Sequence, residues 1–144
     1  MDNQIITRKM QAEDYPNAYA LWQQVPGMNL REFDDSFEEI SRLLRFNPNF
    51  CFVAETKTDK QIIGSILGAT DGRRGTIYHL AVAPGYQNQG LGTQLVNKVI
   101  EQLQAVGIHK IFVNVMKDNL TGQSFWQQLK FVKRSDVIRF NKII

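Results

Sequence analysis

A glycine-containing turn lies between an apolar, strand-like run and the strongest helical pattern of the chain. The turn reads Gln87-Asn88-Gln89-Gly90-Leu91-Gly92 and follows the strand-like segment 76–83. The first backbone N–H groups of a helix have no partner within the helix, and the helix dipole adds partial positive charge there. Glycine lets an anion approach these amides closely because it carries no side chain. The arrangement therefore predicts a binding site for a phosphate or pyrophosphate group.

Two common phosphate-binding loops fit this turn poorly. A P-loop requires Gly-Lys followed by Ser or Thr, whereas Gly92 is followed directly by Thr93. A dinucleotide fingerprint requires a third glycine, but the corresponding residue is Leu95. It also belongs to a parallel, doubly wound sheet, while the segments upstream of this turn look like hairpins. The sequence thus disfavours both alternatives.

The segments around the turn predict a chain that mixes helices and strands. Apolar alternation predicts strands at 5–10, 50–55, 61–69, 76–83, 109–116 and 137–144, and helical spacing predicts helices near 18–25, 36–44, 95–103 and 121–130. Short polar turns indicate an antiparallel meander, followed by one βαβ crossover at the glycine turn. We expect an α/β (α+β) fold whose mixed, mostly antiparallel sheet of six to seven strands is flanked by about four helices. Residues 1–144 are expected to form a single domain.

The turn and its surroundings together resemble the GCN5-related N-acetyltransferase (GNAT) family. The family motif is Gln/Arg-x-x-Gly-x-Gly/Ala, which residues 87–92 match, and the preceding strand with Leu80, Val82 and Pro84 matches as well. Asn119, followed by Phe125-Trp126, resembles the next motif of the family. The order of elements also agrees, so the resemblance covers essentially the whole chain.

The resemblance implies a site for acetyl-CoA, which serves as the acyl donor, and an N-acetyltransferase activity. Amides of the glycine turn would hold the pyrophosphate, and free backbone groups of the preceding strand would bind the pantetheine arm. The residues implied in binding acetyl-CoA are Leu80, Ala81, Val82, Gln87, Asn88, Gln89, Gly90, Leu91, Gly92, Thr93, Asn119 and Trp126. No metal site is expected, because the two histidines and one cysteine have unrelated spacings.

Proton transfer has two candidate residues on the strand before the turn. Many members of the family carry a tyrosine acid where this chain has Trp126, whose indole N–H donates hydrogen bonds but is not a useful acid. Tyr78 is the candidate acid or acceptor contact, and a half-buried sheet aromatic is the alternative interpretation. His79 is the candidate base if a β-bulge reverses the strand alternation; otherwise it is a packed or hydrogen-bonded sheet histidine. The N–H of Val82 is expected to stabilise the oxyanion.

The acceptor site is expected near the first two helices, which line it in the GNAT family. Candidate acceptor contacts are Trp22, Arg31, Asp34 and Asp35. The segment 30–36 also has a simpler interpretation, because acidic residues are common at helix N-termini.

Composition bounds the remaining possibilities. The net charge of +3 comes from scattered Lys and Arg, which disfavours nucleic acid as a partner. No apolar run approaches the roughly 20 residues of a membrane helix, no secretory signal begins the chain, and the lone Cys51 fits a reducing cytoplasm.

We predict direct transfer of the acetyl group to a primary amine, on a small molecule, protein N-terminus or lysine. A non-catalytic acyl-CoA-binding sensor is the alternative. Segment 137–144 could pair across a homodimer.

Overall fold

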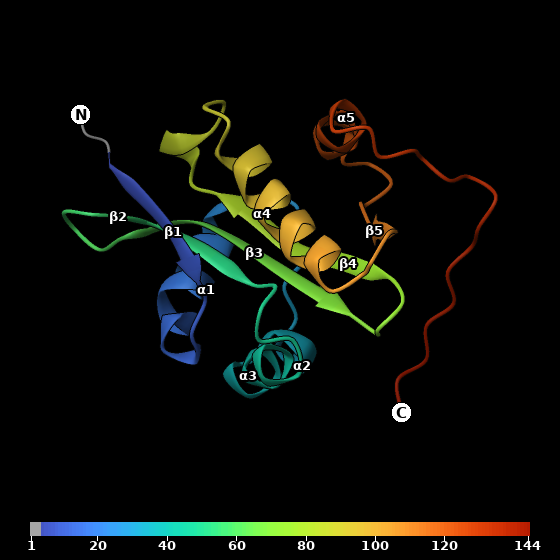
Figure 1. Cartoon of the computed structure of the whole chain (residues 1–144), viewed down its shortest axis with the longest axis horizontal. Coiled ribbons are helices and arrows are strands. Elements are labelled where there is room, and N and C mark those ends of the chain that lie inside the picture. Colours follow the sequence, from blue (N-terminus) through green and yellow to red (C-terminus); the bar gives the residue numbers. More distant parts are fainter. Residues whose placement is uncertain (1–3) are drawn as a thin grey trace. The chain divides into compact units, whose positions relative to one another are not determined.

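A computed structural model describes residues 4–144, which form two compact units that divide after Asn114. The elements of the first unit are β1 (Ile5–Lys9), η1 (Ala12–Asp14), α1 (Tyr15–Gln24), α2 (Glu32–Asp35), α3 (Phe37–Phe46), β2 (Phe52–Thr56), β3 (Ile62–Thr70), β4 (Gly75–Val82), η2 (Pro84–Tyr86), α4 (Leu91–Ala105) and β5 (Ile111–Val113) (Figure 1). The second unit, Val115–Ile144, contains α5 (Leu120–Gln128).

The strands of the first unit form one sheet in the order β1-β2-β3-β4-β5. Neighbouring strands from β1 to β4 are antiparallel, whereas β4 and β5 are parallel. Parallel neighbours need a crossover connection, and α4 supplies it. The predicted mixed sheet, the meander and the βαβ unit after the glycine turn are therefore confirmed.

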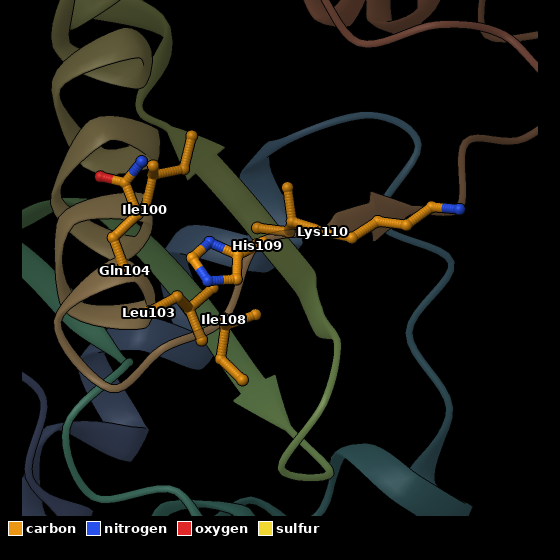
Figure 2. A pocket seen from close by; sticks show the side chains of 7 residues that line it. Ile100, Leu103, Gln104, Ile108, His109 and Lys110 are labelled. Carbon is orange, nitrogen blue, oxygen red and sulfur yellow. The ribbon is translucent and has the colours of Figure 1, made fainter.

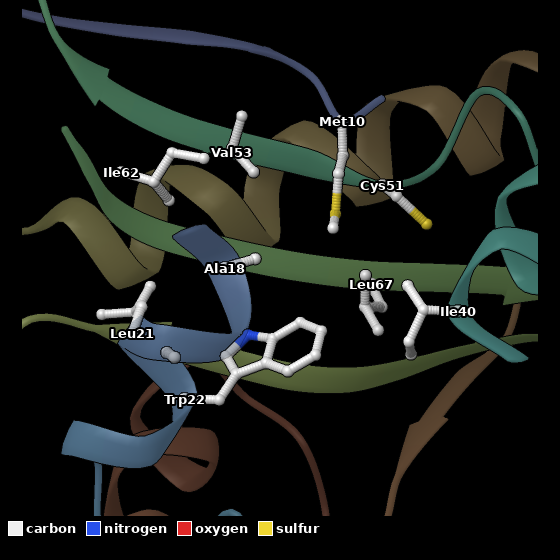
Figure 3. Close-up of a cluster of buried hydrophobic side chains, with 10 residues drawn as sticks. Met10, Ala18, Leu21, Trp22, Ile40, Cys51, Val53, Ile62 and Leu67 are labelled. Carbon is white, nitrogen blue, oxygen red and sulfur yellow. The ribbon is translucent and has the colours of Figure 1, made fainter. Parts of the chain in front are cut away.

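The two faces of the sheet are covered by different helices. Successive strand residues point to opposite faces. Ser65 accepts a hydrogen bond from Trp22 of α1, while its neighbour Gly64 faces Leu91 and Leu95 of α4. Figure 1 shows α4 running across β3 and β4. The core on the α1 face contains Met10, Ala18, Leu21, Trp22, Ile40, Cys51, Val53, Ile62, Leu67 and Ala81 (Figure 3).

The number of elements differs from the prediction. The sheet has five strands rather than six to seven, and residues 4–144 contain five α-helices rather than about four. The extra helix is α2, which Ser36 separates from α3 by its extended backbone and by accepting the Glu39 N–H as the α3 cap. The predicted strand at 137–144 is wrong, since these residues are irregular and Ile138 and Phe140 are exposed. Alternation predicts a strand only where a neighbouring strand satisfies the backbone.

Both ends of α5 in the second unit are capped. Asn119 Oδ1 accepts the Gly122 N–H at 2.9 Å at the start of the helix. At its end, the Lys130 N–H donates to the Gln127 carbonyl and the Phe131 N–H to the Trp126 carbonyl. This hydrogen-bond pair is a Schellman motif, and the Trp126 and Phe131 rings supply its apolar contact at 4.9 Å between centroids.

Candidate functional site

A β-bulge in β4 turns His79 onto the α1 face of the sheet. The β3–β4 register pairs Leu67 with Tyr78 and Ser65 with Ala81, so two residues of β4 lie opposite one residue of β3. His79 has φ of +50°, a left-handed conformation that is uncommon for residues other than glycine. Consecutive residues of a regular strand point to opposite faces, yet Tyr78 and His79 both lie on the α1 face. The bulge that the sequence analysis required for His79 is therefore present.

Residues of α1 and β3 hold the bulge in place. The Trp22 indole lies edge-on to the His79 ring, with 4.8 Å between centroids. The same indole donates its N–H to Ser65 Oγ at 2.8 Å, and the Ser65 hydroxyl donates to the His79 carbonyl at 3.4 Å. Trp22 is only 1% exposed. In this structure it therefore supports the histidine and is not presented to an acceptor.

Asp35, at the end of α2, forms a hydrogen-bonded pair with His79. The distance from His79 Nε2 to Asp35 Oδ1 is 2.6 Å, and the two side chains are 18% and 7% exposed. The other carboxylate oxygen, Oδ2, accepts the Arg31 backbone N–H at 2.8 Å. The Tyr15 hydroxyl donates to the Asp35 carbonyl at 2.6 Å. Burial, with nearby acidic groups, raises the pKa of Tyr15, so this hydroxyl remains a donor.

The other candidate residues of this region face solvent. Arg31 and Asp34 are exposed, and Tyr78 is 41% exposed beside the bulge. All three side chains are accessible to solvent. Sequence reasoning named His79 and Asp35 separately but did not pair them, and it missed Tyr15 and Ser65. The only signal for Ser65 in the sequence was that it is a polar residue within the apolar run 61–69.

The C-terminal half of β4 has an open edge. β5 pairs with β4 only from Gly75 to Ile77, so within residues 4–114 no strand pairs with the remainder of β4 on that side. The Ala83 N–H donates to Ile63 of β3, and backbone direction alternates along a strand. The backbone of Val82 therefore points toward the open edge. Its carbonyl accepts Gln87 Nε2 at 2.9 Å, which leaves its N–H for another partner.

The glycine turn presents free amides at the start of α4. Gly90 is the N-cap residue with φ of +85°, and no side chain caps the helix. The first intrahelical bond runs from the Gln94 N–H to the Gly90 carbonyl, so the N–H groups of Leu91, Gly92 and Thr93 have no partner inside the helix. A Cβ atom built on Gly90 would meet no protein atom within 4 Å. The space beside Gly90, at the start of the helix, is thus open.

Two candidate residues lie in the second unit and have structural roles there. Asn119 uses its carbonyl oxygen to cap α5, so its Nδ2 remains available as a donor. Trp126 packs edge-on against Phe125 and Phe131. The predicted contacts of Asn119 and Trp126 with pantetheine stay predictions.

One further cavity lies away from the residues described above. A cavity of about 120 Å³ lies between the C-terminal half of α4 and the loop before β5, lined by residues that include Leu103, Ile108 and His109 (Figure 2). It is at the opposite end of α4 from the glycine turn. Within residues 4–144 no group of three His, Cys, Asp or Glu side chains could hold a metal ion. None of the helices described there is long and apolar enough to cross a membrane.

Comparison with known proteins decides the family. The model of the acetyltransferase (GNAT) family matches residues 10–131. The chain belongs to the GNAT family. An acetyltransferase from Sodalis glossinidius is 30% identical to this GNAT chain over 135 residues, covering 94% of this chain and 92% of the relative. The family resemblance inferred from residues 87–92 and their surroundings is therefore confirmed.

Solved structures show the same fold. Ard1 from Thermoplasma volcanium matches with a TM-score of 0.79 at 18% identity, covering 91% of this chain and 84% of that protein. The PaiA N-acetyltransferase from Thermoplasma acidophilum, solved in complex with coenzyme A, matches with a TM-score of 0.75 at 20% identity, covering 88% and 89%. These matches confirm the GNAT fold, and the family and its named relatives support acyltransferase activity.

Proposed function

We propose that this GNAT protein transfers the acetyl group of acetyl-CoA to a primary amine by direct attack in a ternary complex. The observation that carries the proposal is the open edge of β4 beside the free amides at the start of α4. The pantetheine arm of an acyl-CoA carries amide groups that can hydrogen-bond to the free backbone groups of β4. Its pyrophosphate can accept hydrogen bonds from the free N–H groups of α4. The coenzyme A complex of PaiA supports the choice of an acyl-CoA donor.

The free amides suit the pyrophosphate of acetyl-CoA. The N–H groups of Leu91, Gly92 and Thr93 have no partner within α4, and the helix dipole adds to the attraction of an anion. The Leu91 side chain is buried, so this residue offers only its backbone. Along the β4 edge, the Val82 N–H is the donor that we assign to the acyl oxygen, where negative charge develops during the attack.

Two side chains beside this edge can transfer protons. The His79 imidazole lies at the bulge of β4, and we propose it as the base that receives a proton from the amine. Tyr78 is exposed next to it, and we propose it as an acceptor contact or as the acid for the departing thiolate. A thiol has a pKa near 8.5, so its thiolate leaves with little assistance.

The test measures donor binding and turnover separately. We expect calorimetry to detect acetyl-CoA binding, and release of free thiol to depend on an added amine from a panel of polyamines, amino acids, aminoglycosides and peptides. Thiol release that never depends on an amine, with acetyl-CoA still bound, would favour the non-catalytic sensor. Absence of acetyl-CoA binding would refute both proposals.

The acceptor surface and location are also proposals. We propose that Arg31 and Asp34, which are exposed at α2, contact the acceptor. Substituting Arg31 or Asp34 with alanine should raise the KM for the amine and leave acetyl-CoA affinity unchanged.

We propose a cytoplasmic location, in keeping with the free, buried Cys51, and fractionation of cells tests it.

A further inference from the structure

We propose that Asp35 is a positioning residue that selects the tautomer of His79, so that Nδ1 is the nitrogen that accepts the proton from the attacking amine. The proposal rests on the acetyl transfer proposed above and adds the assignment of one proton. Asp35 and His79 are 44 residues apart in the sequence, and their 2.6 Å contact joins α2 to the bulge of β4.

The hydrogen bonds around Asp35 determine where the imidazole proton lies. An ionised carboxylate only accepts hydrogen bonds, so the Nε2 that contacts Asp35 Oδ1 must be the protonated nitrogen. Oδ2 is already engaged by the Arg31 N–H at 2.8 Å, which prevents the carboxylate from rotating freely. A neutral His79 with its proton on Nε2 has a lone pair on Nδ1.

Nδ1 is the nitrogen that remains open. Within residues 4–144 it has no hydrogen-bond partner, and it is not among the buried polar atoms that lack one, so it reaches solvent. The ring is held by the edge of Trp22, and its backbone by the Ser65 hydroxyl. The left-handed backbone of His79 is strained, and strain of this kind concentrates at functional sites.

The proton balance of the step follows from this geometry. The amine nitrogen forms a bond to the acyl carbon while the carbon–sulfur bond breaks, and the electron pair leaves with sulfur. One proton passes from the amine nitrogen to Nδ1 and produces an imidazolium. Asp35 stabilises that cation through the Nε2–H and does not itself take the proton.

The substitution Asp35→Asn tests the assignment through a geometric constraint. The Arg31 N–H can only donate, so it holds the amide oxygen of the new side chain at the Oδ2 position. The amide NH₂ then faces His79 Nε2, which has to accept. The imidazole proton moves to Nδ1, and the base is lost although the shape of the site is retained.

The spectroscopic measurement is the tautomer of His79, observed by ¹⁵N–¹H correlation of histidine-labelled protein. The chain has two histidines, and the variant His109→Gln leaves only the signals of His79. We expect the Nε2–H tautomer in the wild-type protein and the Nδ1–H tautomer in Asp35→Asn. An Nδ1–H tautomer in the wild-type protein overturns the proposal, and this measurement needs no variant of Asp35 and no turnover.

The kinetic measurement is amine-dependent thiol release. General base catalysis contributes about 10²–10⁴-fold, so we expect kcat of Asp35→Asn to fall about 100-fold or more, with the KM for acetyl-CoA unchanged. Glu38→Gln removes the same charge from the neighbouring helix, and we expect its kcat to remain within about twofold of wild type. A folded Asp35→Asn enzyme with wild-type kcat overturns the proposal. Failure of the proposed acetyl transfer would appear differently, as no turnover by the wild-type protein whatever its tautomer.

Discussion

Gly90 and Gly72 form a matched pair for testing the anion site. Both have positive φ, +85° and +99°, and a Cβ built on either would meet no protein atom within 4 Å. Alanine at each position therefore introduces the same backbone strain without a clash. Only Gly90 lies at the start of α4, while Gly72 lies in the turn between β3 and β4.

The stability cost should be similar in the two variants. A residue with a Cβ costs about 1–2 kcal/mol in the left-handed region. For a chain of this size, that corresponds to a fall in Tm of about 3–6 °C for both Gly90→Ala and Gly72→Ala. Thermal unfolding followed by circular dichroism measures this change.

Affinity for acetyl-CoA should separate the two variants. The space around Gly90 is empty of protein, so a new methyl group there can obstruct only a ligand. Displacing a phosphate oxygen from one amide loses a charge-assisted hydrogen bond worth about 1.5–3 kcal/mol. We expect calorimetry to show a Kd for Gly90→Ala raised about 10- to 100-fold, and an unchanged Kd for Gly72→Ala. Equal affinity of the two variants would refute the assignment of the glycine turn.

Three further predictions concern stability and reactivity. Lys130 holds the left-handed position of the Schellman motif with φ of +73°, so Lys130→Gly should raise the free energy of unfolding by about 0.5–1 kcal/mol, and a loss measured in denaturant would contradict this. Burial raises the pKa of the Cys51 thiol to about 11, so the native protein should not react with Ellman's reagent at pH 8, while the unfolded protein should. Burial disfavours the Asp14 carboxylate, but hydrogen bonds from Arg8 and the Gln11 N–H outweigh this effect and lower its pKa below 3.8. The resulting stability is present above that ordinary value and is lost as the pH falls below it. Arg8→Met should therefore cost about 2 kcal/mol at pH 7 and less at pH 3, and an equal loss at both pH values would count against the ion pair.

The sequence was sufficient to predict the βαβ unit and the glycine turn because both depend on local patterns. Gly90 precedes an apolar stripe at helical spacing, and this pattern places a helix start within a residue or two. The family followed from residues 87–92 with their flanking elements, and the comparison with known proteins confirms it.

The arrangement of His79 could not be predicted in this way. Regular strand alternation would place it on the opposite face from Tyr78, and only the bulge brings it to Trp22 and Asp35. A bulge adds one residue to a strand, and the pattern of apolar and polar side chains does not reveal it. The contact with Asp35 depends on tertiary packing. The prediction of a strand at 137–144 was wrong for a related reason, since apolar residues form a strand only when a partner strand is present.

The open edge of β4 has a consequence for the protein without its ligand. An unpaired stretch of strand exposes N–H and C=O groups that can pair with another chain, which is a common route to aggregation. An acyl-CoA molecule that hydrogen-bonds along Tyr78–Val82 would occupy these N–H and C=O groups, so they could no longer pair with another chain. The concentration of acyl-CoA would then govern the solubility of this protein on storage as well as its turnover.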